Sequence, residues 1–421
     1  MSPVDLNRLD LGSPYGLLAR LEAVPDPRRK RGVRHHVAQI LAIATLATLR
    51  GATSLTAIGE VASELPEEAL VALRCRRSPR SGAYVAPEES TIRRMLKAVD
   101  ADAVDLVVNA WVADQVAAGR LGEHIGSVEL KAMLDAESDA ASEPDDDPDD
   151  EEPDDPPIRQ AIAVDGKTLR GARTSSGPAV HLMSAMTHAE GATVAQREVD
   201  TKTNEITGFR PLLENLDLND VVVTADAMHA QRAHAAFLVG EKGAHYVFGV
   251  KDNQPSLAAA AERLTAHRRV VYATHEKGHG RIEHRSVRIA SIPKALAKRL
   301  DFPTASQFVS IERRRTTRVD QKTSIETSHY VTDLGTEFAG ARELALHIRG
   351  HWGIENRGHY VRDRVFDEDR SQVRTGGAPQ VLATLRNLAM SILRLHGFKS
   401  IAAGLRWAGW DHRRAIALLG V

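Results

Sequence analysis

The stretch DVVVTADAMHAQRAHAAFLVGEKGAHYVFGVK, residues 220–251, decides the fold class. It opens with an apolar, β-branched run that ends at Asp226, and an apolar helical pattern follows around Ala230 to Gly240. A second β-rich run, HYVFGVK, closes it. Three strand-like runs precede this stretch: AIAVDG, VHLMSAMTHA and ATVAQREV. Strands that alternate with helices in this way predict a mixed α/β sheet.

Beyond that stretch, a second β-rich segment covers about 270–333. Its clearest strands are RIEHRSVRIA and FVSIERRRTT. This segment interrupts the α/β pattern as an insertion would, and the chain becomes helical again from Glu343. We therefore expect one α/β domain over 158–421 with a β-rich insertion.

An acidic run at 135–157 separates this body from the preceding part of the chain. The run holds 13 acidic residues, no Lys or Arg, and many prolines, a composition typical of a disordered linker. The chain has 421 residues, which favours two or more domains. Residues 1–134 are expected to form an all-α domain of their own.

Basic residues mark this N-terminal part. The segment EESTIRRMLKAV, 88–99, predicts a helix that carries Arg93 and Arg94. With the helical pattern before it, the segment fits either a helix-turn-helix reader or a plain bundle with a solvated basic face. The arm PDPRRKRGVRHH, 25–36, could contact phosphates.

The amino-acid composition indicates which kinds of partner and compartment suit the chain. Because 13 of the 56 acidic residues lie in one run, 55 basic residues face 43 acidic ones elsewhere, an excess of about 12 positive charges that suits a polyanion. The single Cys75 excludes an internal disulfide framework and fits a reducing cytoplasm. The start, MSPVDLNRLD, does not fit a secretory signal, and the longest apolar stretch, Val37 to Leu49, is too short to span a bilayer.

Two aspartates occupy positions that suit catalysis. Asp165 and Asp226 each follow an apolar strand, where an open α/β sheet presents residues to a ligand. Two such aspartates and a glutamate from a later helix, Glu355, would supply oxygen ligands for Mg²⁺. Two ions could activate water or a 3′-hydroxyl for attack on a phosphodiester. A strand-end aspartate that only caps a turn is the structural alternative.

Five motifs point to one family: LEAVPDPRRKRGVRHHVAQILAIA, IAVDGKTLRGA, TADAMHAQ, HGRIEHR and HWGIENRGHYVRDRVFDEDRSQVRTG. From about Leu17 to Leu395 the chain resembles the ISAs-type insertion-sequence transposases, which include the H-repeat-associated proteins. The resemblance implies a ribonuclease H-like catalytic core with catalytic and metal-binding residues at Asp165, Asp226 and Glu355. Related enzymes carry Tyr, Arg and Lys where this chain has Ile348, His351 and Arg362.

The resemblance also implies Mg²⁺ or Mn²⁺, two ions in all, and a DDE transposase that cuts double-stranded DNA at terminal repeats and joins it to target DNA. Because two DNA ends must be brought together, the resemblance implies a homodimer or a higher synaptic complex. It also implies a protein of the bacterial cytoplasm that is associated with the nucleoid and does not bind a membrane. The residues expected to contact DNA, each with a solvated or structural alternative, are Lys167, Arg170, His229, His279, Arg281, His284, Arg285, His351, Arg362, Arg93 and Arg94.

Other interpretations remain open at this stage. His347 and His351, with Glu355 one turn on, could bind zinc, and so could His275, His279 and His284. A catalytically silent or domesticated DNA-binding protein would keep the fold and the basic surface, and a nuclease for RNA or unspecific DNA would share the three carboxylates. Trp352, Trp407 and Trp410 could stack on bases, although packing in the core is the preferred expectation.

Overall fold

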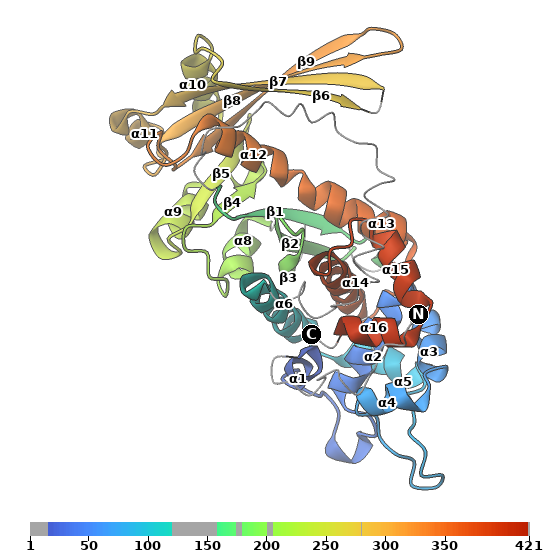
Figure 1. The fold of residues 1–421 in the computed structure, drawn as a ribbon. Coiled ribbons are helices and arrows are strands. Elements are labelled where there is room, and N and C mark those ends of the chain that lie inside the picture. The colour runs from blue at the N-terminus through green and yellow to red at the C-terminus, as the bar shows by residue number, and fades with distance from the viewer. Residues whose placement is uncertain (1–15, 120–157, 174–178, 200–204, 279, 420–421) are drawn as a thin grey trace.

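The computed structural model describes residues 16–119, 158–173, 179–199, 205–278 and 280–419 (Figure 1). The predicted acidic linker, 135–157, and His279 lie outside the described residues. The described chain is a mixed α/β structure with a helical region at its N-terminal end and a large mixed sheet.

The sheet has nine strands in the order β3-β2-β1-β4-β5-β9-β8-β7-β6. Neighbours β1, β4 and β5 run parallel, and all other neighbours run antiparallel. Parallel neighbours need crossover connections, which here contain helices. The strands are β1 Ala161–Thr168, β2 His181–Thr187, β3 Thr193–Val199, β4 Val222–Ala225, β5 His245–Val250, β6 Tyr272–Gly278, β7 Arg281–Ser291, β8 Gln307–Thr317 and β9 Thr323–Thr332.

Strands β6 to β9 fall within the segment that the sequence predicts as an insertion. They do not form a separate sheet, because β9 pairs with β5 from Val247↔Thr332 to Val250↔His329. The insertion therefore continues the sheet, and its strands occupy one end of the molecule (Figure 1).

The two faces of the sheet are covered by different helices. Along β1, Ala163 packs with Ile354 on one face, whereas Ile162 and Val164 enter the main core on the other face. Alternation of side chains across a strand produces this division. The helices of the body are α8 Glu205–Leu213, α9 Arg232–Glu241, α10 Pro255–Thr265, α11 Lys294–Arg299, α12 Ala341–His351, α13 Tyr360–Val365, α14 Ala378–Leu395, α15 Ile401–Gly409 and α16 His412–Leu419.

The N-terminal helices share the main core with this body. Helix α2 contacts α14, α15 and α16, and α6 packs on β3 and α14 (Figure 1). One contiguous cluster of buried apolar side chains runs through both parts. The helices are α1 Leu17–Leu21, α2 Val37–Leu49, α3 Leu55–Ser63, α4 Glu67–Ala72, α5 Glu89–Ala98 and α6 Ala101–Ala118.

Helices α3 and α5 pack against each other, but α4 and a long connection separate them in sequence. A helix-turn-helix joins its two helices by a short turn. The α3–α5 pair lacks such a turn, so the structure favours the plain bundle. None of the helices in the described ranges combines the length and apolar character needed to cross a membrane.

Candidate metal centre

Strand register brings the two aspartates side by side. The parallel pairing of β1 and β4 reaches Val164↔Ala225, so Asp165 and Asp226 come next on adjacent strands, which lie about 4.8 Å apart. Asp226 is exposed and directly follows β4, as the sequence predicts. Asp165 instead lies within β1, because β1 continues to Thr168 along β2.

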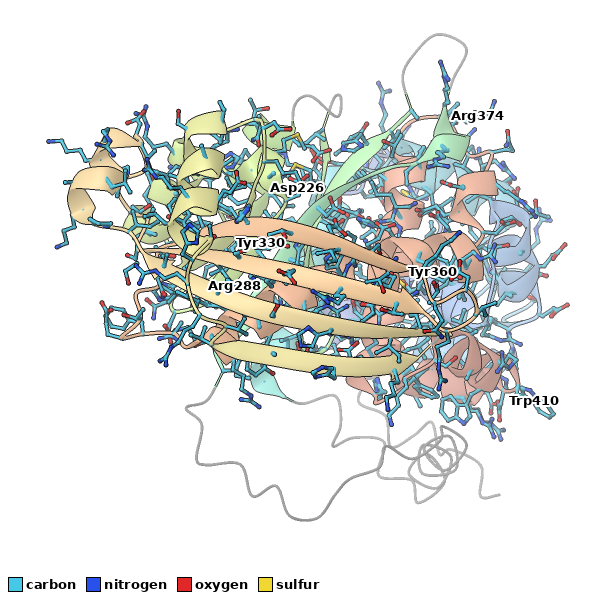
Figure 2. The ribbon with its side chains drawn as sticks, turned by 90° about the horizontal axis from the view of Figure 1, so that it is seen from above. Asp226, Arg288, Tyr330, Tyr360, Arg374 and Trp410 are labelled. Atoms are coloured by element: carbon cyan, nitrogen blue, oxygen red, sulfur yellow. The ribbon has the colours of Figure 1, made fainter. Side chains whose placement is uncertain are left out.

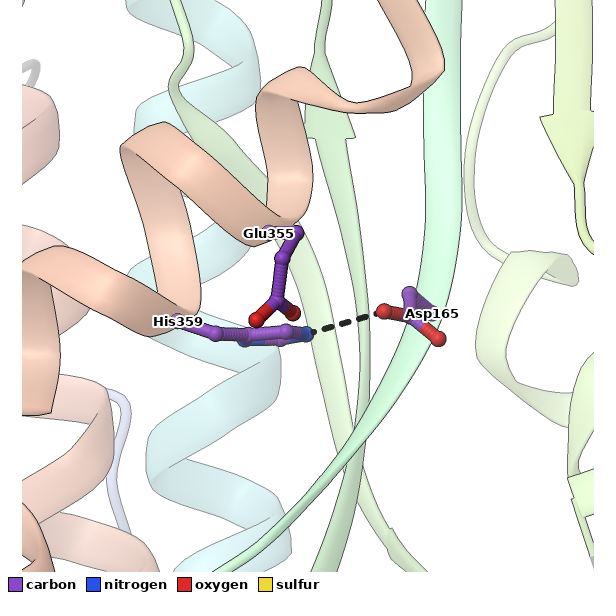
Figure 3. Close-up of side chains that lie close together, drawn as sticks. All are labelled: Asp165, Glu355 and His359. Carbon is purple, nitrogen blue, oxygen red and sulfur yellow. Dashed lines mark ion pairs between the residues drawn. The ribbon is translucent and has the colours of Figure 1, made fainter. Parts of the chain in front are cut away.

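Glu355 reaches Asp165 from the helix that covers this face. Helix α12 packs on β1 and β4, and the π-helix Ile354–His359 (η7) continues it. Ile354 anchors η7 against Ala163 and Met186. Ligand atoms of Asp165, Glu355 and His359 all lie within 4.8 Å of one another (Figure 3). Across the residues that the structure describes, this is the only such group of three His, Cys, Asp or Glu residues.

His359 is a member of the group that sequence reasoning missed. It is buried, and its Nε2 lies 3.4 Å from Oδ2 of Asp165 (Figure 3). The Nε2 atom makes no hydrogen bond that satisfies normal geometry. The spacing of Glu355 and His359, four residues apart on a helix, was a signal that could have identified it.

The π-helix explains why Arg362 does not join the site. A regular α-helix over 347–362 would present residues 347, 351, 355 and 362 on a common face, but η7 contains a wider turn. At 100° per residue, one additional residue turns the following side chains away from the face expected for an α-helix. Arg362 is only 1% exposed, and its Nε donates to Oε2 of Glu368 at 2.8 Å.

Electrostatics favour an ionised Asp165. Burial would raise its pKa, but His359, the Gly166 N–H at 2.8 Å from Oδ1, and His351 together lower it below the usual value. The pKa of His351 is lowered by burial, against the opposing effect of both Asp165 and Asp226. His351 therefore lies close enough to sense both aspartates.

A buried histidine layer supports this side of the sheet. Thr224 Oγ1 lies 3.1 Å from His351 Nδ1 and 2.9 Å from His188 Nε2. Burial lowers the pKa of His188 to about 3. A Cβ at Gly350 would come within 2.3 Å of His188 Nδ1, so glycine at this position allows α12 to pack closely. His351 is thus occupied in supporting the site.

The donor set suits a hard divalent cation. Two carboxylates and one imidazole, those of Asp165, Glu355 and His359, come together, whereas Asp226 lies beside Asp165 by strand register and its Oδ1 accepts from Met228 N at 3.0 Å. Mg²⁺ is commonly held by one or two protein carboxylates together with substrate phosphates. The residues of the alternative zinc site, His347, His351 and Glu355, do not come together. His347 lies 3.4 Å from Glu343 and His351 contacts Thr224, so neither joins Glu355.

Three predicted DNA contacts are revised because their side chains are buried. Lys167 donates to Asp363 Oδ2 at 2.7 Å, and His229 is 1% exposed beside Glu205. Arg362 pairs with Glu368 as described above. Lys167 and Asp363 lie 196 positions apart in the chain, whereas Arg362 and Glu368 lie 6 apart, and each of these three side chains has a structural role in this conformation.

Other predicted DNA contacts lie at the surface. Arg170 is largely exposed, Arg94 is exposed, and Arg93 is part-exposed and paired with Glu89. The rings of His284 and His275 contact each other at a tilt of 51°, with centroids 4.2 Å apart. Arg281 and Arg285 line a cleft instead.

This cleft, about 790 Å³ in volume, lies between strands β6 to β9 and the helical segment α12–η7. Figure 2 views the four strands from above. The cationic side chains that line the cleft outnumber its acidic ones, Glu276, Glu283 and Glu326. Trp352 also lines the cleft and is 59% exposed, and Trp410 is 85% exposed, so core packing was the wrong expectation for both. The cationic lining residues are Lys277, Arg281, Arg285, Arg313, Arg349 and Arg357.

Comparison with known proteins identifies the family. Residues 156–392 match a family profile described as "Transposase DDE domain", and residues 18–112 match one described as "DDE_Tnp_1-associated". "Putative transposase YncI" of Escherichia coli O157:H7 is 26% identical over 404 residues, covering 94% of this chain and 90% of that protein.

"H repeat-associated putative transposase YhhI" of Escherichia coli strain K12 is 32% identical over 261 residues, covering 59% of this chain and 67% of that protein. Among solved structures, a piggyBac transposase in a synaptic complex with hairpin DNA aligns with a TM-score of 0.38 and 9% identity, over 95% of this chain and 78% of that one. The "Transposase DDE domain" profile spans more than half of the 421 residues, and the chain therefore belongs to the DDE transposase family.

Proposed function

We propose that this transposase cleaves DNA at the ends of its element and joins those ends to target DNA, with Asp165, Asp226 and Glu355 as the catalytic carboxylates. The observation that carries the proposal is the meeting of Asp165 and Glu355 beside Asp226. Residues 165 and 355 come from opposite ends of the body, so the fold itself assembles the group.

Asp165, Asp226 and Glu355 would hold two Mg²⁺ or Mn²⁺ ions, which supply the activation of water or of a 3′-hydroxyl and stabilise the leaving oxygen. The exposed Glu355 and Asp226 leave the outer side of this centre open to a phosphodiester. His359, buried behind Glu355 and in contact with Asp165, keeps Asp165 ionised and oriented.

DNA would enter along the cleft between β6–β9 and α12–η7. Gly353, Asn356 and Arg357, which lie close to Glu355 in sequence, are among the residues that line the cleft. Guanidinium groups that line it would hold phosphates, a contact that fixes position rather than sequence. Arg281 and Arg285, which line the cleft, would be among these groups.

The remaining parts of the proposal concern architecture. Strands β1 to β5, with aspartates at adjacent central strands and helices on both faces, would form the ribonuclease H-like core. The N-terminal helices and the basic arm at 25–36 would bind the terminal repeats. At least two chains would act together, since two DNA ends must be joined.

The test is Mg²⁺-dependent cleavage and joining of duplex DNA that carries the ends flanking the gene. We expect Asp165→Asn, Asp226→Asn and Glu355→Gln to bind this DNA but to lose about 10²- to 10³-fold in rate, because removal of a catalytic electrostatic group has that order of cost. Asp301→Asn, an exposed carboxylate outside the group, serves as the matched control and should stay active.

Random duplex DNA and RNA are the further arms of the same assay. Equal cleavage of all substrates would indicate an unspecific nuclease. Binding of the ends without cleavage by the native chain would indicate a silent DNA-binding protein. Activity retained in the three carboxylate variants would contradict the catalytic assignment.

A further inference from the structure

A second acidic group lies behind the candidate metal centre, on the opposite face of the sheet from α12. Glu205, the first residue of α8, is 2% exposed. Its Oε1 lies 2.7 Å from His181 Nε2 on β2, and the other ring nitrogen of His181 lies 2.8 Å from Thr168 Oγ1 on β1. Glu205 therefore connects α8 to the two strands that hold Asp165.

Glu205 approaches the backbone next to Asp165 through the space left by a glycine. A Cβ at Gly166 would lie 2.6 Å from Glu205 Oε1 and 2.7 Å from His181 Nε2, closer than carbon tolerates. Side chains alternate across β1, so Asp165 points to the α12 face while position 166 faces Glu205. Glycine at 166 allows a carboxylate to pack directly against the catalytic strand.

The other oxygen of Glu205 reaches the segment that follows Asp226. Oε2 lies 3.6 Å from Nε2 of His229, which belongs to the short helix η6, Ala227–His229. Asp226 begins this helix and accepts a hydrogen bond from Met228 N at 3.0 Å. The His229 ring also contacts Phe209 of α8, with centroids 5.0 Å apart. Glu205 thus contacts both aspartate-bearing segments from behind.

We propose that Glu205 is a positioning residue for the metal centre, which holds the backbone beside Asp165 and Asp226 at a fixed separation and adds negative charge behind the bound cations. The proposal rests on the proposed function. Groups behind a metal site commonly change its affinity or activity 10- to 100-fold when they are removed.

The charge of Glu205 persists at neutral pH. Burial would raise its pKa, but the hydrogen bond with His181 and the nearby His229 ring outweigh burial and lower the pKa to about 2. In a partly buried environment, a carboxylate on the other side of the strand attracts a divalent ion more strongly than it would in water.

The test measures Mn²⁺ binding by electron paramagnetic resonance, on the full chain and without DNA. We expect Glu205→Gln, which keeps the shape of the side chain, to weaken Mn²⁺ binding by about 10- to 100-fold. The matched control is Asp333→Asn. Asp333 is also the partner of a histidine, with its Oδ2 2.7 Å from His245 Nδ1 and its side chain 8% exposed, but it lies at the opposite end of the parallel strands. The control should bind Mn²⁺ within about twofold of the native chain, which is the scatter expected for independent sites.

Thermal unfolding of both variants separates stability from metal affinity. If Glu205→Gln does not fold, Glu205→Asp and His181→Asn take its place, and each should weaken Mn²⁺ binding by a smaller factor. Folded Glu205 variants with native Mn²⁺ affinity would overturn the proposal. Equal weakening in Asp333→Asn would also overturn it, since a general loss of packing would then be the cause.

Asp165→Asn and Glu355→Gln, measured in the same series, report on the centre itself. If they and the native chain bind Mn²⁺ alike, or if the native chain binds none, the metal centre is refuted and the role of Glu205 with it. If they lose binding while Glu205→Gln retains it, only the role of Glu205 is refuted.

Discussion

At the scale of single residues, His359 shows how the fold completes a site that three carboxylates only outline. It approaches Asp165 from the same helical segment that carries Glu355, and its buried ring has no other hydrogen-bond partner at Nε2. Such a histidine can either join a bound cation or hold the aspartate in place. Both roles require the ring nitrogen at this position.

We expect His359→Ala to reduce cleavage by about 10- to 100-fold, because Asp165 loses its imidazole partner while all three carboxylates remain. His359→Asn, whose amide can still donate to Asp165, should retain more activity than His359→Ala. The measurement is a comparison of single-turnover cleavage rates at saturating DNA. A rate for His359→Ala equal to that of the native chain would show that the contact is incidental.

At this scale the sequence predicts the position of some site residues and the burial of others less well. The resemblance was enough to select Asp165, Asp226 and Glu355, and the register of β1 and β4 places two of them together. It could not show that Lys167, His229 and Arg362 are buried. Their partners Asp363, Glu205 and Glu368 are brought to them by tertiary packing or by a change in helix geometry, and neither is visible in residue spacing.

At the scale of secondary-structure elements, the π-helix between α12 and α13 determines which side chains reach Asp165. Arg357 fixes this wide turn to the loop after β2, since its guanidinium donates to the backbone carbonyls of His188 at 3.0 Å and Glu190 at 2.7 Å. The glycines at 353 and 358 suggest an irregular helix in the sequence, but they do not reveal the extra residue. A regular α-helix over these residues would instead carry Arg362 to the site.

Deletion of Asn356 should convert this turn toward a regular α-helix. Glu355 and His359 would then be three instead of four residues apart in a narrower turn, which would shift the His359 ring relative to Glu355 and Asp165. We expect cleavage to fall by about 10²-fold, the order of cost for misplacing a catalytic group by an ångström. The measured quantity is the cleavage rate, with deletion of Gln321 in the exposed β8–β9 turn as the control. An active Asn356 deletion would show that the wide turn is dispensable.

At the scale of the whole molecule, one helix joins the parts that the sequence separates. Helix α14 contacts α2, α5, α6 and β3. At its centre, the fully buried Asp105 of α6 accepts hydrogen bonds from Gln380 at 2.8 Å, from Gln196 at 2.9 Å, and from Thr384. The sequence predicted helices on both sides of the acidic run, but their common core depends on contacts between residues that lie almost the whole chain apart.

Burial raises the pKa of Asp105 to about 7, against the opposing effect of these hydrogen bonds. Because the pKa of Asp105 is raised in the folded state, its protonated form stabilises the fold. This contribution to the free energy of unfolding is complete below the usual pKa near 3.8 and is lost as the pH rises toward 7. We therefore expect Asp105→Asn, which mimics the protonated form, to keep the stability that the native chain loses as the pH rises.

The free energy of unfolding in urea, measured at pH 5 and pH 8, tests this expectation. Relative to the native chain, Asp105→Asn should gain about 2–3 kcal/mol between the two pH values, since each unit of pKa shift corresponds to about 1.4 kcal/mol. Asp114→Asn, on the exposed side of the same helix, should show no such gain. Parallel pH dependence in Asp105→Asn and the native chain would contradict the assignment.

The shared core also constrains the order in which the chain can fold during synthesis. Helix α2 is covered by α14, α15 and α16, so its apolar surface stays exposed until the last of these helices leaves the ribosome. At 5–20 residues per second, that delay is on the order of 20–75 s. We therefore expect the nascent N-terminal helices to be clients for chaperones, and a chain interrupted before residue 378 to leave no stable N-terminal fragment.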